Sequence, residues 1–302
     1  MKVFVSGATG VIGHRAVQRL VEAGHHVTGV ARTDEKAASL RQFGANPVGV
    51  SLFDAAALKD VIGGHKAVVN LATNIPPLDQ ALNPQAWETN DRLRNEASVK
   101  LAKAAAEAGC EVFIQESITI PYAASGENWI DESAEVIRPP ELSSNGIAEE
   151  QAKWFAETGG QGIVLRFAMF YSHDGSHTQA FQAAIRAGQS PFMGDPDGYV
   201  SMVHVEDAAT AVASALSAPA EIYNVADDKP MRRRDLANTI AKIEGVAPPA
   251  LPEVMDGEVP GLIAALMRSQ RISNKRFKGT TGWAPQYRSV LQGWRQLITA
   301  QQ

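Results

Sequence analysis

The sequence predicts an α/β fold built on a doubly wound parallel sheet, with a small C-terminal lobe that binds substrate. Three observations predict it: a glycine-rich turn after the first strand, an alternation of apolar strand-like runs with helical patterns, and a more proline-rich, irregular final part. Alternating strands and helices form right-handed βαβ units, which bury a parallel sheet between two helical layers. Ligands of such sheets bind beyond the carboxyl ends of the strands.

The glycine-rich turn lies between a short apolar run, residues 3–5, and a helical pattern. Gly7 permits a tight turn, Gly10 lets a pyrophosphate approach the backbone, and Gly13 lets the helix pack closely on the strand. The unpaired N–H groups at the helix start then face the phosphates. The turn therefore predicts a Rossmann-type dinucleotide site, and a glycine-rich turn without a ligand is the alternative. The predicted cofactor-binding residues of this loop are Gly7, Thr9, Gly10, Val11, Ile12 and Gly13.

Strand-like and helical segments then alternate along the chain. The predicted strands cover 27–31, 47–50, 67–71, 112–115 and 163–167. The predicted helices cover 37–43, 55–62, 91–108 and 151–158. Asp54 is the expected N-cap of the second helix, and Gly109 ends the third as a C-cap glycine does. We expect residues 1–168 to form the dinucleotide-binding domain, with 201–226 returning to it, and 169–302 to form mainly the substrate-binding lobe.

Composition narrows the class of protein. The chain has 302 residues, of which 45% are hydrophobic and 20% charged, with a net charge of −5. Apart from Arg232–Arg234 it has no basic tract, which argues against a nucleic-acid partner. No apolar run is long enough to span a bilayer, and we expect a cytoplasmic enzyme with no membrane contact. Because Cys110 is the single cysteine, a disulfide framework and cysteine-rich metal sites are excluded, and we predict no metal.

The residue after the second strand indicates the type of dinucleotide. A carboxylate there binds the adenosine ribose of NAD, whereas an arginine pairs with the 2′-phosphate of NADP. The chain has Arg32 at this point, and we expect Arg15 of the first helix to assist. Asp34 leaves NAD open, and a solvated Arg32 without a ligand is a further alternative. We therefore expect NADP(H), with NAD(H) less favoured.

Several segments carry a resemblance that covers nearly the whole chain. They are 7–13, 52–54, 69–73, Asn90, 165–167, 203–207, 223–225, 271–274 and 282–285. In this order they resemble the extended short-chain dehydrogenases/reductases, the family of NAD-dependent epimerases and dehydratases. The resemblance implies a homodimer through two central helices, 91–108 and 147–158. It also implies that the cofactor contacts Phe53, Asp54, Leu71, Ala72, Thr73 and Asn90.

Members of this family carry a Ser or Thr after the fifth strand, then a Tyr-x-x-x-Lys pair, then an acidic residue. The tyrosine transfers a proton, the lysine lowers its pKa, and the Ser or Thr orients the substrate oxygen. Ser117 stands at the first position here. Counting back from Glu150 places Leu142 and Gly146 at the Tyr and Lys positions. No Tyr in this chain is followed four residues later by Lys.

A substitute for this pair is therefore needed. Tyr122 lies five residues after Ser117 and is the best substitute phenol by position, so Ser117 and Tyr122 are the predicted catalytic residues. The polar cluster Tyr171–His177 is the next candidate. We expect an NADP(H)-dependent oxidoreductase that acts on a small carbonyl or alcohol substrate with an unusual proton donor. A redox-neutral isomerase, epimerase or cyclase in the same pocket and a non-catalytic NADP(H) sensor or scaffold are the alternatives.

Overall fold

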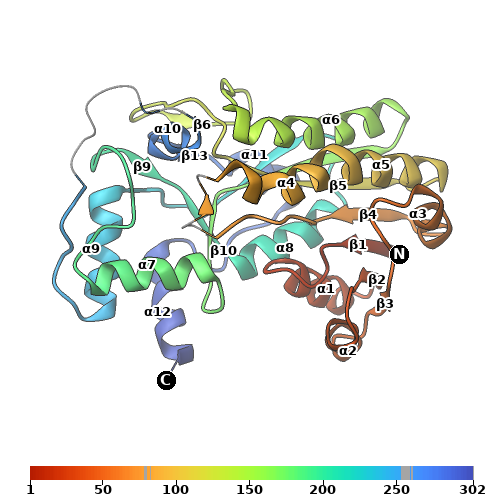
Figure 1. Cartoon of the computed structure of the whole chain (residues 1–302), viewed down its shortest axis with the longest axis horizontal. Coiled ribbons are helices and arrows are strands. Elements are labelled where there is room, and N and C mark those ends of the chain that lie inside the picture. The colour runs from red at the N-terminus through yellow and green to blue at the C-terminus, as the bar shows by residue number, and fades with distance from the viewer. Residues whose placement is uncertain (78–79, 82, 253–258, 260, 302) are drawn as a thin grey trace.

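The structure is a computed structural model, and it describes residues 1–77, 80–81, 83–252, 259 and 261–301. At its centre lies a parallel sheet of seven strands in the order β11-β7-β5-β4-β1-β2-β3 (Figure 1). This topology confirms the predicted doubly wound α/β fold. The seven strands are β1 (Lys2–Ser6), β2 (His26–Val30), β3 (Asn46–Val48), β4 (Ala67–Asn70), β5 (Val112–Ile118), β7 (Gln161–Phe167) and β11 (Ile222–Val225).

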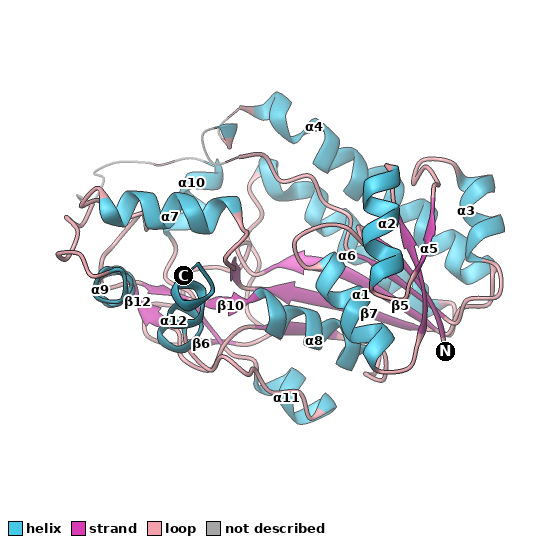
Figure 2. Ribbon diagram, turned by 90° about the horizontal axis from the view of Figure 1, so that it is seen from below, coloured by secondary structure: helices cyan, strands magenta, loops and turns pink. Residues whose placement is uncertain are grey.

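Helices cover both faces of the sheet (Figure 2). Successive strand residues point to opposite faces, so Val3 and Val5 join one apolar core while Phe4 joins the other. The first core is completed by α1 (Gly13–Glu22), α2 (Asp34–Gln42) and α8 (Val205–Ala215). The second is completed by α3 (Ala55–Ile62), α5 (Ser98–Glu107) and α6 (Ser143–Glu157). Burial on both faces explains why the strands read as continuous apolar runs.

Two local signals in the sequence are confirmed. Asp54 caps α3, because its carboxylate accepts a hydrogen bond from the N–H of Ala57 at 3.1 Å. Gly109 follows α5 with a φ of +70°, the left-handed conformation that glycine adopts without strain. Both signals involve residues close in sequence, which is why they can be recognised without the fold.

Most boundaries differ from the prediction by a few residues, and three of the differences bear on the site. Strand β5 continues to Ile118, so Ser117 lies inside the strand. Helix α6 begins at Ser143, well before residue 151, and follows a 3₁₀ turn over Pro140–Leu142. The long central helix begins earlier, as α4 (Pro84–Arg92), and passes through a π-helical segment, Leu93–Ala97, into α5. The early turns of α4 and α6 are mainly polar, so an apolar period does not reveal them.

No helix in the described ranges is long and apolar enough to cross a membrane.

The remaining elements build the lobe, which has a core of its own around Trp294, Leu236 and Phe181. The lobe and its junction with the sheet contain β6 (Trp129–Ile130), β8 (Met169–Tyr171), α7 (Ser176–Arg186), β9 (Tyr199–Val200), β10 (Met202–His204), β12 (Met231–Arg232), α9 (Arg233–Glu244), α10 (Gly261–Met267), β13 (Arg271–Ile272), α11 (Lys275–Thr281) and α12 (Val290–Gln301).

Buried carboxyl groups lie at this junction. Asp207 accepts hydrogen bonds from the N–H groups of Gln286 and Tyr287 at 2.6 and 3.0 Å. Asp227 is 1% exposed, and its Oδ1 accepts from the N–H of Lys229 at 3.0 Å. Burial raises the pKa of Asp207 to about 6 and that of Asp227 to about 8. Burial lowers the pKa of the nearby His204 to about 4. Near neutral pH, Asp227 therefore holds a proton in the folded protein, whereas the same carboxyl group in an unfolded chain has released it.

We predict that stability falls as the pH rises from about 6.5 to about 8, because the native state holds a proton on Asp227 that the unfolded state has already released. His204 and Asp207 titrate mainly below this window. Asp227→Asn keeps the acceptor for Lys229 and should flatten the slope by up to about 1.4 kcal/mol per pH unit. Urea unfolding at several pH values measures how the free energy of unfolding changes with pH. Asp131→Asn is the control, since the pKa of Asp131 is lowered and Asp131 is not among the groups that raise the pKa of Asp227. An unchanged slope in Asp227→Asn contradicts the assignment.

Candidate cofactor and active site

The predicted cofactor loop joins β1 to α1, and its three glycines have different roles. Gly7 has a φ of +70°, and a Cβ there would lie 2.4 Å from the carbonyl carbon of Leu71. A Cβ on Gly13 would lie 1.9 Å from the carbonyl oxygen of Gly7, so Gly13 is required within the turn itself. A Cβ on Gly10 would meet only that same oxygen, at 3.3 Å. Gly7 and Gly13 thus serve the packing of the loop, and Gly10 leaves an open side for a ligand.

The start of α1 fits a pyrophosphate. Its N-cap position, Ile12, provides no side-chain acceptor, so the first N–H groups of the helix have no side-chain cap. Gly10 is exposed, Val11 is 43% exposed, and Thr9 is half-buried, whereas Ile12 is buried. An uncapped helix N-terminus behind an exposed glycine turn attracts anions through its N–H groups and its dipole. The residues present therefore fit a dinucleotide.

The loop after β4 passes closely over Gly7, which has no side chain to keep it away. The N–H of Ala72 donates to Oδ1 of Asn70 at 3.3 Å, and the N–H of Asn74 donates to Oδ1 of Asn90 at 3.1 Å. Asn90 is 1% exposed and acts here as an anchor of this loop, while its contact with a cofactor stays a prediction. Of the predicted residues, Leu71 and Ala72 lie against Gly7, and Thr73 follows them in the same loop.

A hollow of about 280 Å³ opens beside the end of β2. Arg32, Thr33, Asp34 and Arg41 help to line it. Within the described ranges, the side chains of Arg32 and Arg41 form no hydrogen bond or ion pair. Sequence reasoning missed Arg41, whose only signal is its position two helical turns into α2. Two unpaired guanidinium groups in one hollow make it suited to an anion.

Phe53 and Asp54, the predicted adenine-contacting residues, follow β3. The guanidinium of Arg92 lies 4.4 Å from the ring centre of Phe53, a cation–π contact. The carboxylate of Asp54 is exposed but already caps α3 through Ala57. The structure places both residues at the same edge of the sheet as Arg32, and their contact with adenine stays a prediction.

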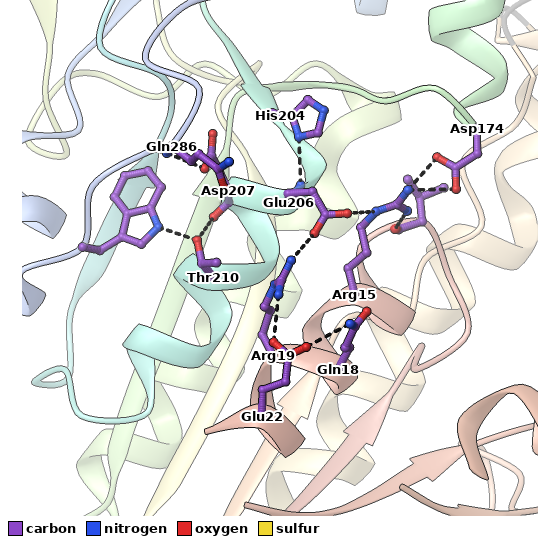
Figure 3. A network of polar contacts seen from close by, with 12 residues as sticks. Arg15, Gln18, Arg19, Glu22, Asp174, His204, Glu206, Asp207, Thr210 and Gln286 are labelled. Atoms are coloured by element: carbon purple, nitrogen blue, oxygen red, sulfur yellow. Dashed lines mark hydrogen bonds and ion pairs between the residues drawn. The ribbon is translucent and has the colours of Figure 1, made fainter. Parts of the chain in front are cut away.

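Arg15 lies away from this hollow, so the expectation that it assists at a 2′-phosphate is wrong. Figure 3 shows it between α1, α8 and the loop after β8. It is 5% exposed, and its guanidinium donates to Glu206 at 2.8 Å and to both oxygens of Asp174 at 3.0 Å. It also donates to the carbonyl oxygen of Val11 at 2.8 Å. Arg15 therefore ties the glycine loop to the lobe.

Ser117 belongs to a buried ion-pair network. It is fully buried, and its hydroxyl donates to Oε1 of Glu149 at 2.7 Å. Arg166 donates to both oxygens of the same carboxylate at 2.8 and 2.7 Å, and Arg138 donates to Oε2 at 2.5 Å. Burial alone would raise the pKa of Glu149, but the hydrogen bonds and charge of Arg166 hold it below its usual value. Glu149 is therefore an ionised, buried anchor.

Tyr122 is joined to this network and is 1% exposed. Its hydroxyl donates to Oδ1 of Asn224 at 2.9 Å and accepts from Nη1 of Arg166 at 2.8 Å. Burial raises the pKa of Tyr122 despite the nearby charge of Arg166. The structure thus brings Ser117 and Tyr122 together through Arg166, and both hydroxyls already have hydrogen-bond partners inside the protein. Their catalytic roles stay predictions, and this placement argues against them.

The two adjacent acids of α6 that follow the expected Tyr and Lys positions lie in different environments. Glu149 is the buried acid of α6, whereas the side chain of Glu150 is 66% exposed and pairs with Lys153 at 3.7 Å. Leu142, one of the positions counted back from Glu150, is 1% exposed and packs with Trp87. Because only Glu149 is held inside the fold, it is the better starting point for this count, one residue before Glu150.

With this geometry established, the chain can be compared with known proteins. Its sequence is 28% identical to the 3-diazoavenalumate denitrifying reductase of a Streptomyces species, with 98% of each chain covered. It is 24% identical to the 2-alkyl-3-oxoalkanoate reductase of Shewanella oneidensis, over 90% of this chain and 73% of that protein.

Solved structures show the same fold. UDP-glucose 4-epimerase of Thermotoga maritima superimposes with a TM-score of 0.77 at 20% identity, covering 99% of this chain and 98% of that one. A dTDP-glucose 4,6-dehydratase double mutant of Streptomyces venezuelae, with NAD bound, gives 0.79 at 17% identity, covering 100% and 97%.

The family and the names of the relatives point to an NAD(P)-dependent oxidoreductase or epimerase. Residues 3–226 match the NAD dependent epimerase/dehydratase family. This match spans most of the chain and includes the glycine turn, the loop after β4 and β11. The chain belongs to the NAD-dependent epimerase/dehydratase family.

Proposed function

We propose that this chain is an NADP(H)-dependent oxidoreductase of the extended short-chain dehydrogenase/reductase type, acting on a small carbonyl or alcohol substrate. The observation that carries the proposal is the glycine turn over an uncapped helix start, because Gly7 and Gly13 admit no side chain while Gly10 leaves room for a ligand. A bound nicotinamide cofactor supplies or takes up a hydride. The chain's own part is to hold that cofactor and the substrate.

NADP(H) is favoured over NAD(H) by charge. Arg32 and Arg41 line the same hollow and neither guanidinium has a hydrogen-bond or ion-pair partner among the described residues. A 2′-phosphate provides the oxygen acceptors that such groups bind, often in a bidentate manner. Asp34 lines the same hollow and supports the alternative of a ribose hydroxyl. The balance of two arginines to one aspartate favours the phosphate.

The names of the relatives favour a redox reaction. Both reductases named above align with at least 90% of this chain. The epimerase and dehydratase structures are under 25% identical to it and therefore support the fold alone. A redox-neutral isomerase or cyclase and a sensor of NADP(H) remain the alternatives. NADPH consumption with a panel of carbonyl compounds separates them: binding without consumption supports the alternatives.

We also propose a cytoplasmic location and a homodimer through the two central helical segments, 91–108 and 147–158. Ile147 on α6 is 43% exposed, which is consistent with a contact between copies. Light scattering of the purified chain tests the dimer.

We predict that Arg32→Ala and Arg41→Ala each weaken NADPH binding more than NADH binding. A lost charged hydrogen bond costs about 1.5–3 kcal/mol, roughly ten- to hundredfold in affinity. Isothermal titration with each cofactor measures the ratio. Lys36→Ala is the matched control, because Lys36 lies on the same helix outside the lining of the hollow. Equal affinity of the wild-type chain for both cofactors would refute the NADP(H) preference.

A second prediction concerns the glycine turn. Gly10→Val should leave the fold intact but block the pyrophosphate, because the added Cβ meets only one oxygen at 3.3 Å. Gly13→Ala should instead unfold or strongly destabilise the loop, because its Cβ would lie 1.9 Å from a carbonyl oxygen. Circular dichroism melts and NADPH titration distinguish the two effects. If Gly10→Val binds NADPH as the wild type does, the pocket lies elsewhere.

A further inference from the structure

Two polar atoms near the start of α6 have no hydrogen-bond partner among the described residues. They are Oε2 of Glu141 and Nδ2 of Asn145, and both atoms are buried. Asn145 as a whole is only 2% exposed, and its side chain forms no hydrogen bond with the part of the chain that the structure describes. Burying an amide without a partner costs free energy, so each such group calls for an explanation such as a missing ligand.

The position of the two residues is that of an active site in this architecture. They lie four residues apart where the 3₁₀ turn leads into α6, which places them on neighbouring turns. Leu142, between them, packs in one apolar cluster with Trp87 and with Ile118, the last residue of β5. The pair therefore lies beyond the carboxyl end of β5, where doubly wound sheets bind their ligands.

The lobe closes over this point. A Cβ on Gly261, the first residue of α10, would lie 2.5 Å from Oε1 of Glu141, so the carboxyl group packs against α10. Figure 1 shows the start of α6 between α10 and α4. Glu141 thus lies at the boundary between the sheet and the lobe, on the side where ligands of this architecture bind.

The spacing of the family's motif, counted from the buried acid Glu149, selects the same two residues. Glu149, held by Arg166 and Ser117, is the buried one of the two adjacent acids that could match the acid after the family's Tyr-x-x-x-Lys pair. Counting back from Glu149 by the spacing applied earlier to Glu150 reaches Glu141 and Asn145. The burial of Glu149 and the unpartnered atoms are separate observations, and both select Glu141 and Asn145.

We propose that Glu141 and Asn145 form the catalytic pair of this enzyme, with Glu141 exchanging a proton with the substrate oxygen and Asn145 donating a hydrogen bond to that oxygen. This inference rests on the proposed function. In alcohol oxidation, the alcohol O–H bond breaks and its proton goes to the Glu141 carboxylate. The carbon-bound hydrogen leaves as hydride to NADP⁺, and the C=O bond forms. Carbonyl reduction is the reverse, with solvent restoring the proton on Glu141.

Two readouts test the proposal, and one of them needs no substrate. Thermal unfolding compares Asn145→Leu with the wild type. Because the buried amide has no partner, an apolar side chain of similar size should leave the midpoint unchanged or raise it. A residue with a merely structural role would lower the midpoint when replaced, and a lower midpoint overturns the proposal, whether or not the wild type accepts the probe substrate.

The second readout is turnover with NADPH and para-nitrobenzaldehyde, and with NADP⁺ and the corresponding alcohol. Glu141→Gln and Asn145→Leu should each lower kcat by about a hundredfold or more. Glu141→Gln should also remove the acidic limb of the pH profile for alcohol oxidation, because a carboxylate accepts a proton only when ionised. Glu150→Gln, an exposed acid on the same helix, is the control and should behave as the wild type.

Titration of NADPH into the wild type and each variant distinguishes a wrong catalytic pair from a wrong proposed function. All variants should bind NADPH about as tightly as the wild type. If they bind it and turn over at the wild-type rate, the catalytic pair is wrong and the oxidoreductase assignment stands. If the wild type binds no NADPH, the proposed function itself fails.

Discussion

The buried ion pair between Glu149 and Arg166 fixes how α6 lies against the sheet. Arg166 stands on β7 and donates two hydrogen bonds to Glu149 on α6, while Ser117 on β5 adds a third. Removing one partner of such a pair leaves an uncompensated buried charge, which typically costs 3–5 kcal/mol. A shift of α6 by one residue would bring Glu150 opposite Arg166 and move Glu149 away from it. Arg166 would then lose the carboxylate that neutralises it. The pair therefore determines which side chains at the start of α6 face the site.

A second constraint links the cofactor loop to the lobe. Arg15 contacts the carbonyl of Val11 in the glycine loop, Asp174 after β8 and Glu206 on α8 (Figure 3). One buried cation thus sets the relative position of three segments that are far apart in the sequence. A dinucleotide on the glycine loop and a substrate under the lobe would be held by the same contacts. Geometry of this kind, with reacting groups fixed on rigid elements, is what hydride transfer requires.

Features that depend on neighbours in sequence could be predicted, and features that depend on distant partners could not. The glycine turn, the Asp54 cap and the Gly109 terminus follow from local backbone chemistry. From the sequence, Arg15 could assist Arg32 at a phosphate, and only the structure shows that Arg15 is paired with Glu206, 191 residues away. Glu149 and Glu150 are adjacent acids, and only the packing of α6 shows which one is buried. From the sequence, the family's spacing counted from Glu150 reaches Leu142 and Gly146. Counted from Glu149, it reaches Glu141 and Asn145.

A crystal structure of the chain with NADPH tests the account most directly. It should place the pyrophosphate at Gly10 and the start of α1, with the 2′-phosphate in the hollow of Arg32 and Arg41. The nicotinamide ring should lie at the carboxyl end of β5, facing Glu141 and Asn145 across the substrate space. A nicotinamide directed away from the start of α6, or a 2′-phosphate that contacts neither arginine, would contradict the account.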